Sequence, residues 1–486
     1  IITGLVNDLG GLPLSDVAVT ILDRPEYGTA LTGPDGRFAM PLDGGDTLTV
    51  VYQKTDYLTV HRKVSVGWND IAVTETVRLI TADTTRTKIV FDGNPDKVVT
   101  HQSTPVTDDF GVRSCSLVFT GDNQAYFLDE GGNDVFELST ITVRATEYRT
   151  QASMPAELPP TSGFTYCAAL TVDGVQKVRF DNPVVAWIEN FLGFDVGIPV
   201  PVGFYDQAKA AWVPLEDGLV VRLLDTDSDG IVDALDADGD HVADDLDLDG
   251  LVSDEVEGLG DPSIYVPGTT YWRSELSHFS EVDWNFPIGG PEDGTETTAE
   301  AKVQTDEVQS ANDPCKNHRS SFTDDRNRIH HEVIQVPGTG ISLHYDSSRT
   351  PGYRHVLTVP ASGPTVPASL KRIDVEATVA GRILSRSLDP MPNQVTQFVW
   401  DGLDFRGQPV RGSVTAKVAI GFVYDGVYYL PIPVARSFAL AGIQSTGVSA
   451  RQEVTLWERT DVTLRKGAGE IAEGWSLSPH HTCLLY

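Results

Sequence analysis

One segment constrains the fold of this chain more than any other, because residues 225–257 contain fourteen carboxylates and no lysine or arginine. Like charges at this density repel one another unless a cation or solvent screens them. The acidic residues follow the order Asp-x-Asp-x-Asp-Gly from Asp225 onward. This order places oxygen atoms around the inside of a tight loop, and calcium takes six to eight oxygen ligands. The pattern therefore predicts calcium-binding loops, and the alternative is a solvated acidic loop without an ion.

Three overlapping loops are predicted within this segment. The first uses loop positions 1, 3, 5, 7 (a backbone carbonyl), 9 and 12, which are Asp225, Asp227, Asp229, Ile231, Asp233 and Asp236. The second loop repeats the spacing with the ligands Asp236, Asp238, Asp240, Asp244 and Asp247. It shares Asp236 with the first loop and Asp247 with the third. His241 stands where glycine is expected. The third begins with Asp245, Asp247 and Asp249, and either Asp254 or Glu255 closes it. Aspartate at position 12 resembles thrombospondin type 3 and dockerin-like loops more than helix–loop–helix sensors, which carry glutamate there.

The remainder of the chain has the pattern of short strands. Val17, Val19 and Ile21 occupy every second position, and alternation with a period of two is typical of half-buried strands. The chain holds 44 glycines and 29 prolines against three methionines, which favours turns and strands over helices. We therefore expect an all-β fold of tandem antiparallel β-sandwich domains that carries the Asp-rich segment.

Turn-rich joints and shifts in composition predict the domain limits. Residues 289–312 carry almost no large apolar side chain, which is typical of a linker. The expected order is a first sandwich at 1–80, a second at 81–180, a β domain with the acidic insert at 181–288, a linker at 289–324 and a last sandwich at 325–486.

Charge and motifs exclude several classes of function. Thirty-six basic against sixty-nine acidic residues give a net charge of −33, which repels phosphate backbones, so nucleic acid is not an expected partner. No apolar run reaches the roughly 18 residues that a membrane span needs, so membrane insertion is not expected. Zinc-protease, nucleophile-elbow and phosphate-loop motifs are absent, so we expect no enzyme. Because the chain begins at Ile1 without methionine, we expect a processed chain or a fragment.

The four cysteines are too few and too scattered for a zinc site. The predicted domain limits favour two disulfide bonds, Cys115 with Cys167 and Cys315 with Cys483. The alternative is buried free thiols, which are common for unpaired cysteine.

A second candidate site lies between residues 185 and 216, where carboxylates and aromatic residues alternate. Glu189, Asp195 and Asp206 stand among aromatic residues that include Trp187 and Trp212. This combination would suit a surface glycan, either as a binding platform or as a pair of catalytic carboxylates. The favoured interpretation is a packed core with acidic residues at the surface.

Several motifs resemble known families. The run from Gly4 to Phe38, with the turn Gly33-Pro-Asp-Gly36, resembles the transthyretin-like or carboxypeptidase-regulatory sandwich, and Trp400-Asp-Gly-Leu with Gly407 resembles an immunoglobulin-like hairpin. Other stretches resemble the amino-terminal region of bacterial RHS/YD-repeat proteins, which are relatives of teneurins and of the cocoon component of Tc toxins. The most telling are Val143-Arg-Ala-Thr-Glu-Tyr148, Pro201-Val-Gly-Phe-Tyr-Asp206, Ser348-Arg-Thr-Pro-Gly-Tyr353 and Gly474-Trp-Ser-Leu477.

The resemblance implies a secreted or cell-surface protein whose first domain is transthyretin-like. The tyrosine–aspartate repeats themselves are absent from this sequence. We therefore expect a non-enzymatic extracellular scaffold, structural or adhesive, that calcium stabilises and that self-associates when the ends 1–6 and 482–486 complete a neighbour's sheet edge. The alternatives are a carbohydrate module and the delivery or plug portion of an RHS-type toxin.

Overall fold

The computed structural model describes residues 1–477 apart from residues 69, 130, 160–161, 298, 300–303, 306–321, 325–328, 348–349, 351–353, 411–413, 432–433, 440–450, 466–469 and 473. Within these residues the regular structure is strand with three short 3-10 helices, η1 (Pro25–Tyr27), η2 (Gln151–Ser153) and η3 (Asp254–Val256). The all-β prediction is confirmed. No helix in the described part has the length and hydropathy needed to cross a bilayer.

The N-terminal sandwich packs two small sheets around one apolar core. One sheet has the order β4-β1-β7, with β8 also paired to β1, and the other has the order β3-β2-β5-β6. The strands are β1 (Ile2–Asp8), β2 (Ala18–Ile21), β3 (Ala30–Leu31), β4 (Arg37–Met40), β5 (Asp46–Gln53), β6 (Val60–Val66), β7 (Ala72–Val73) and β8 (Val77–Leu79). The alternating residues Val17, Val19 and Ile21 lie in the core, as their period of two predicts.

Strand β1 has neighbours on both sides. It pairs antiparallel with β4, and on its other edge it pairs in parallel with β7 and β8. The prediction that residues 1–6 complete the sheet of a neighbouring molecule is therefore wrong, because both edges of this strand are already used. Residues 482–486 lie outside the described part of the chain.

The central sandwich combines two predicted domains. Its larger sheet has the order β10-β13-β18-β24-β22-β19, with β14, β15 and β23 attached, and its smaller sheet has the order β21-β20-β25-β17-β16-β9. The strands are β9 (Thr87–Val90), β10 (Val98–Gln102), β11 (Val106–Asp108), β12 (Gly111–Arg113), β13 (Cys115–Thr120), β14 (Ala125–Leu128), β15 (Asp134–Leu138), β16 (Thr140–Glu147), β17 (Tyr166–Val172), β18 (Val178–Glu189), β19 (Pro199–Val200), β20 (Val202–Asp206), β21 (Ala211–Pro214), β22 (Gly218–Leu224), β23 (Ala234–Asp236), β24 (Thr270–Phe279) and β25 (Glu281–Trp284).

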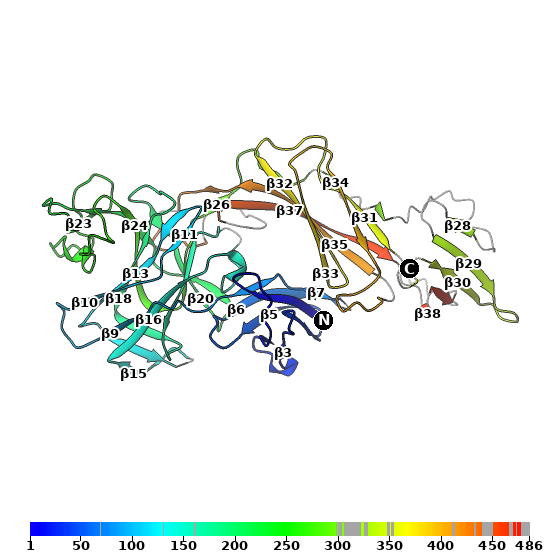
Figure 1. Cartoon of the computed structure of the whole chain (residues 1–486), viewed down its shortest axis with the longest axis horizontal. Helices are drawn as coiled ribbons and strands as arrows, with labels where there is room; N and C mark the ends of the chain where they lie inside the picture. Colours follow the sequence, from blue (N-terminus) through cyan, green and yellow to red (C-terminus); the bar gives the residue numbers. More distant parts are fainter. Residues whose placement is uncertain are drawn as a thin grey trace.

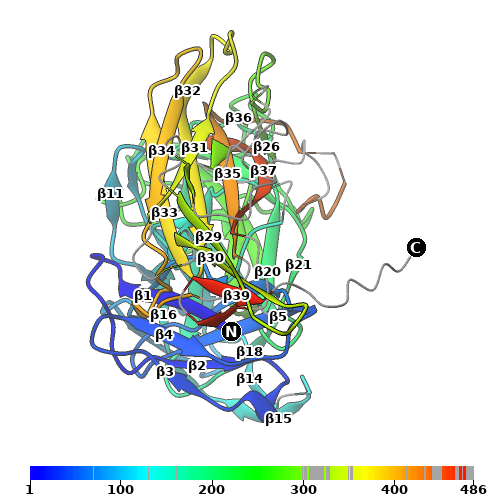
Figure 2. The same ribbon diagram turned by 90° about the vertical axis from the view of Figure 1, so that its right-hand side faces the viewer.

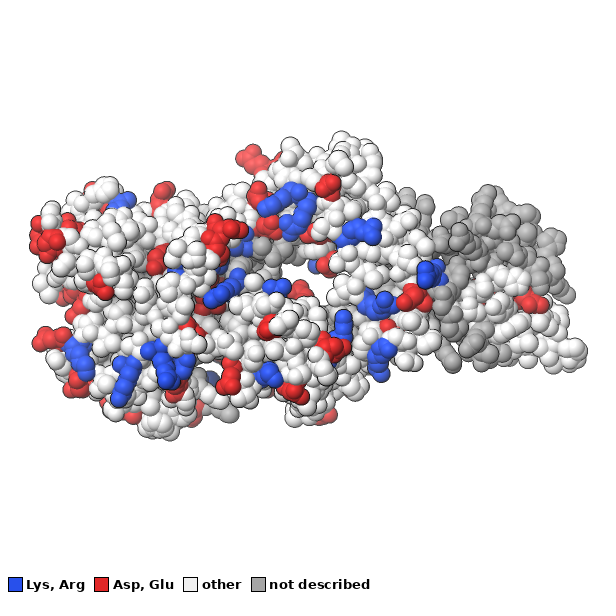
Figure 3. Space-filling view, viewed as in Figure 1, with Lys and Arg blue, Asp and Glu red and all other residues white. Residues whose placement is uncertain are grey.

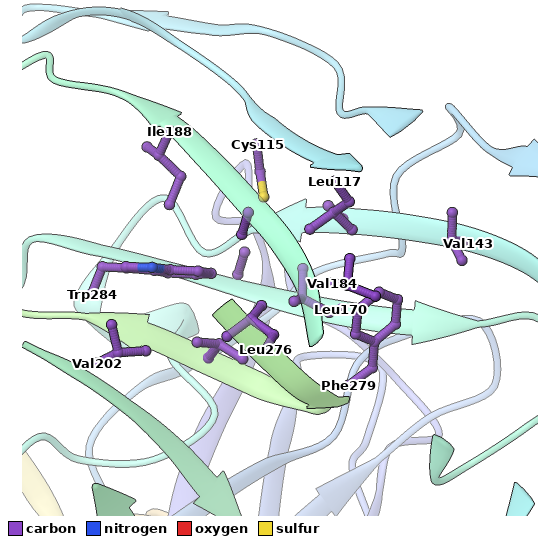
Figure 4. Packing of buried hydrophobic residues seen from close by; sticks show 14 of the residues in the cluster. Cys115, Leu117, Val143, Leu170, Val184, Ile188, Val202, Leu276, Phe279 and Trp284 are labelled. Carbon is purple, nitrogen blue, oxygen red and sulfur yellow. The ribbon is translucent and has the colours of Figure 1, made fainter. Parts of the chain in front are cut away.

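The domain limit predicted at residue 180 falls inside β18, so it is wrong. β18 pairs with β13 from the first predicted domain and with β24 from the next. The core between the two sheets draws on both halves, for example Leu117 and Val143 with Leu276 and Trp284 (Figure 4). Because both predicted domains contribute large apolar side chains to this one core, residues 81–180 and 181–288 form a single sandwich.

The C-terminal sandwich faces the N-terminal one across the molecule (Figure 1; Figure 2). Its sheets have the orders β33-β32-β35-β37 and β27-β31-β34, and β26 pairs with β36 beside them. The strands are β26 (Ile288–Gly289), β27 (Gln304–Thr305), β31 (His355–Pro360), β32 (Leu370–Val379), β33 (Arg382–Leu388), β34 (Val395–Trp400), β35 (Val414–Asp425), β36 (Val427–Tyr428) and β37 (Glu453–Arg465).

A separate sheet extends from this sandwich at the far end of the molecule (Figure 1). Its order is β28-β29-β30-β39-β38, and its strands are β28 (Phe322–Asp324), β29 (Ile329–Gln335), β30 (Ser342–Asp346), β38 (Glu470–Ala472) and β39 (Trp475–Leu477). The predicted segment 325–486 therefore holds a separate sheet in addition to the sandwich. The predicted linker 289–324 contributes β27 to the C-terminal sandwich.

Buried basic residues join the N-terminal and central sandwiches. Arg62 on β6 donates to the carbonyls of Ala152 at 2.9 Å and Met154 at 3.0 Å. The neighbouring His61 ring lies 3.1 Å from the hydroxyl of Tyr205 on β20. Burial first, and then the charge of Arg62, lower the pKa of His61 to about 4. The interface therefore holds a neutral imidazole at physiological pH.

This arrangement predicts that the interface weakens in acid. An unfolded histidine has a pKa near 6.5, so the contribution of His61 is fully present above that pH and is lost as the pH falls towards about 4. Between pH 7 and pH 5 we expect His61 to contribute a loss of about 2 kcal/mol, which His61→Gln removes, whereas His101, whose pKa burial also lowers to about 4, adds to the pH dependence of both proteins. Denaturant titration of the wild type and of His61→Gln at both pH values measures it. Equal pH dependence in the wild type and in His61→Gln would contradict the account.

Candidate metal centre

The Asp-rich segment connects β22 to β24 at one end of the central sandwich, around β23 (Figure 1). A small apolar cluster anchors it to the outer face of the larger sheet. The cluster includes Val232, Leu235 and Val256 of the segment, which pack with Leu223 and Trp187 of the sheet. Acidic side chains gather at this end of the molecule (Figure 3). The sequence folds locally because its few apolar residues face the sheet while its carboxylates face the turns.

The first loop is a turn that Asp225 closes with both of its carboxylate oxygens. Oδ1 accepts the backbone N–H of Ser228 at 2.7 Å, and Oδ2 accepts that of Gly230 at 2.9 Å. Asp233 then accepts the N–H of Thr226 at 2.8 Å. The leading aspartate therefore accepts hydrogen bonds from the N–H groups of the residues three and five positions after it. A second acidic residue, later in the loop, accepts a hydrogen bond from the N–H of the residue directly after the leading aspartate.

The second loop repeats this geometry. Asp236 accepts from the N–H groups of Gly239 at 2.6 Å and His241 at 3.2 Å, which are again three and five residues ahead. Asp244 accepts from Ala237 at 2.6 Å.

The third loop repeats it again with a different closing acid. Asp245 accepts from Leu248 at 2.7 Å and from Gly250 at 2.8 Å. Glu255 accepts from Leu246 at 2.7 Å. Of the two closing residues considered from the sequence, the structure places Glu255 in the role that Asp233 and Asp244 have in the other loops.

The backbone explains why His241 does not interrupt the repeat. In each loop the residues three and five after the leading aspartate have positive φ, a region that favours glycine. One residue of each pair is glycine and the other is not: Ser228 at 66° with Gly230 at 89°, Gly239 at 90° with His241 at 66°, and Leu248 at 63° with Gly250 at 97°. In the second loop the glycine is the third residue after the leading aspartate and not the fifth, and both positions still have positive φ.

Carboxylate oxygens converge at three places. In each group the oxygens lie within 4.8 Å of one another, and the groups are Asp225 with Asp227 and Asp229, Asp236 with Asp238 and Asp244, and Asp245 with Asp247 and Asp249. Asp240 is not part of the second group; it accepts the N–H of Val242 at 2.8 Å. Asp247, which the sequence assigns to two loops, is grouped with the third. The side chain of Ile231 is 41% exposed.

The electrostatics of the three loops differ. Arg222 lies 2.9 Å from Asp236, and Arg273 lies 2.8 Å from Glu255. These two cations were not anticipated from the sequence, because they belong to β22 and β24 rather than to the acidic segment. The N–H of Asp249 lowers the pKa of Asp247, but desolvation, the charges of Asp249 and Asp254 and a contact with Asp245 leave it raised.

The donor set defines what this centre can hold. Every converging group is a carboxylate oxygen, and hard divalent cations such as calcium prefer oxygen ligands in flexible geometry. Soft metals would need cysteine or histidine.

The predicted Cys115–Cys167 disulfide is wrong, because both residues are free and buried. Cys115 on β13 points into the core between the two sheets (Figure 4), whereas Cys167 on β17 belongs to a separate cluster on the outer face of the smaller sheet. Residues 166 and 168 of the same strand face the inner core, so residue 167 must face away. Burial raises the pKa of both thiols. Cys315 and Cys483 lie outside the described residues.

Glu189, Asp206 and Trp212 of the segment 185–216 make hydrogen bonds or ion pairs within the protein. Glu189 accepts the N–H of Ser114 at 2.5 Å and its hydroxyl at 2.9 Å. Asp206 pairs with Lys209 at 2.7 Å. Trp212 donates to the carbonyl of Glu157 at 2.8 Å.

Two regions of the chain match known families. Residues 1–79 match the family described as Teneurin TTR-like domain, and residues 356–440 match the one described as Teneurin 1-4, FN-plug domain. Over these two regions the chain is similar to teneurins. The transthyretin-like identity predicted for the first domain is confirmed. The bacterial RHS part of the resemblance remains a prediction.

Curated relatives give the same picture. The chain is 27% identical to mouse (Mus musculus) Teneurin-3 over 156 residues, which is 32% of this chain and 5% of that protein. It is 28% identical to chicken (Gallus gallus) Teneurin-1 over 152 residues, 31% of this chain and 5% of that protein. It is 33% identical to Teneurin-m of Drosophila melanogaster over 93 residues, 19% of this chain and 3% of that protein. The matches therefore span a small fraction of the relatives' length.

Proposed function

We propose that this chain is a non-enzymatic extracellular scaffold, structural or adhesive, whose Asp-rich segment is a calcium-stabilised contact point. The observation that carries the proposal is the threefold repetition of one turn geometry, in which the leading aspartate of each loop ties down its own backbone. Similarity to the teneurin TTR-like and FN-plug domains supports an extracellular setting. The extended array of sandwiches supports a spacer role.

Calcium would supply the charge that this segment lacks. Each converging group brings three carboxylates together, and the first loop has no arginine beside it among the described residues. A bound divalent cation would replace mutual repulsion with shared coordination and would hold the turns rigid. Residues Asp225, Asp227 and Asp229 would hold one ion, and Asp245, Asp247 and Asp249 another.

The tips of the loops carry apolar side chains that face solvent. Leu248 is 85% exposed, Val242 60% and Leu251 57%. Leu248 also adopts a φ of 63°, a strained backbone for a residue with a branched side chain. Exposed apolar residues that share one small region mark contact surfaces. With calcium bound, this end of the molecule would meet a second copy through these side chains.

We expect calcium-dependent self-association that relies on these tips. Sedimentation velocity with calcium should show dimers or larger species in the wild type and monomers after chelation. Leu248→Ser with Leu251→Ser should weaken association at least tenfold. The matched control is Leu12→Ser with Leu31→Ser, two leucines of the N-terminal sandwich that are 68% and 61% exposed. Monomers under all conditions would reject the adhesive role, and equal weakening by both pairs would reject the loop tips as the contact.

A further inference from the structure

A groove separates the C-terminal sandwich from the N-terminal one, and the space-filling view shows an opening there (Figure 3). The groove encloses about 710 Å³. One wall is the outer face of the sheet β33-β32-β35-β37, represented by Glu376, Ile383 and Trp457, and the other wall includes Glu75 of the N-terminal sandwich and Gln151 of η2. A second hollow of about 540 Å³ continues it, because both are lined by Thr76, Ile383 and Ser385.

The floor of the groove combines apolar surface with hydroxyl groups. The Trp457 ring lies over Gly421 of β35, since a Cβ added at this glycine would stand 2.9 Å from the indole ring. Ile383, on β33 at the opposite edge of the sheet, is 48% exposed. The hydroxyl-bearing lining residues are Thr76, Thr378, Ser385 and Thr455. Such a floor suits the aliphatic stem of a long side chain and the polar groups of an extended backbone.

The groove has unbalanced negative charge. Neither Glu75 nor Glu376 has a hydrogen bond or an ion pair with the described residues, although both belong to opposite walls of the same groove. Burial, and then the charges of Glu75 and Asp374, raise the pKa of Glu376, while Arg459 lowers it. Asp461 adds a third carboxylate.

The basic residues of the groove are already engaged. Lys417 pairs with Asp70 of the N-terminal sandwich, and the guanidinium of Arg459 lies 5.7 Å from the Trp457 ring. The buried Arg62 also acts on Glu75 from behind the wall. A cation that entered between Glu75 and Glu376 would therefore relieve a repulsion that Arg459 offsets only in part.

We propose that this groove binds an extended basic segment of a partner protein, with a lysine or arginine side chain placed between Glu75 and Glu376 and its stem over Ile383. The net charge of −33 steers a basic partner towards the chain and disfavours a second copy as the occupant. The partner would span two modules and hold their relative positions.

Fluorescence anisotropy with a labelled nine-residue peptide of alternating lysine and threonine tests the proposal at physiological ionic strength. Glu75→Gln with Glu376→Gln should weaken binding at least tenfold. The matched control, Glu137→Gln with Glu216→Gln, removes the same charge outside the groove and should change affinity less than twofold. Equal effects of the two pairs would overturn the proposal, as would equal binding of a serine–threonine peptide of the same length.

Hydrogen–deuterium exchange on the unmodified chain gives a second readout that does not depend on variant folding. The lysine–threonine peptide should protect residues 376–385 and 455–461. Protection confined to residues 225–257 would show that the peptide binds the Asp-rich segment instead and would overturn the proposal. If calcium binding or self-association failed, both peptide experiments would still test the groove, because the groove lies in modules other than the one that carries the Asp-rich segment.

Discussion

Arg451→Ala should lower the free energy of unfolding by about 3–5 kcal/mol, because it removes one partner from a buried ionic network. Arg451 precedes β37 and lies 3.0 Å from Asp108 and 3.3 Å from Glu147 of the central sandwich. Its Nε also donates to the carbonyl of Thr165 at 2.8 Å. The guanidinium faces three aromatic rings at 5.0–5.3 Å, those of Phe110, Phe164 and Phe191.

The rest of the network shows why the loss should be large. Arg113, fully buried, donates to Glu147 at 2.9 Å and to Asp108 at 2.7 Å. Burial opposes the ionisation of Asp108, yet Arg113, the N–H of Phe110 and Arg451 hold its pKa at about 2. Two guanidinium groups thus balance two carboxylates, and removing Arg451 leaves Arg113 alone against both carboxylates, so one negative charge in the network is no longer balanced.

Calorimetry of Arg451→Ala should show the thermal transition of the C-terminal sandwich separating from that of the central one, because Arg451 joins them. Arg436→Ala is the control: its ion pair with Glu216, at 3.7 Å between two exposed side chains, should be worth less than about 1 kcal/mol. A loss below about 1 kcal/mol for Arg451→Ala would show that the network does not hold the modules together.

Calcium should raise the stability of the central sandwich. Extracellular modules bind calcium at about 10⁻⁴–10⁻³ M, so 1 mM calcium is about one to ten times the dissociation constant. Each site then adds about 0.4–1.4 kcal/mol, and two sites add about 1–3 kcal/mol. Magnesium is the control, because it demands stricter geometry and keeps its waters, and it should stabilise much less.

A double variant separates ion binding from local packing. In Asp227→Asn with Asp249→Asn each asparagine keeps the oxygen that accepts the N–H of Asp229 or Leu251. The variant should be more stable than the wild type without calcium, because repulsion is reduced, and less stable with calcium, because ligands are lost. If calcium stabilised both proteins equally, these residues would not be its ligands.

The elements that could be predicted are those that local pattern determines. The strand alternation of Val17, Val19 and Ile21, and the order of aspartates from Asp225 onward, are properties of adjacent residues, and the structure has strands and acidic turns there. The displaced glycine at 239 could have been found by comparing the loops with each other.

The remaining features depend on pairing between distant segments. β18 joins sheets whose members lie on both sides of residue 180, and no local signal fixes which strands become neighbours. Asp108, Arg113, Glu147 and Arg451 meet only after three segments have packed. The two cysteines are free because Cys115 lies in the core between the sheets and Cys167 lies on the outer face of the smaller sheet. Which face of each strand is buried in that core also depends on how the strands pair.

Equilibrium dialysis against radioactive calcium at about 1 mM free ion tests most directly whether divalent cations hold the acidic turns. The wild type should retain calcium in a fixed ratio to protein, and Asp227→Asn with Asp249→Asn should retain two ions fewer. A wild type that binds none, or a variant that binds as many, would contradict the account.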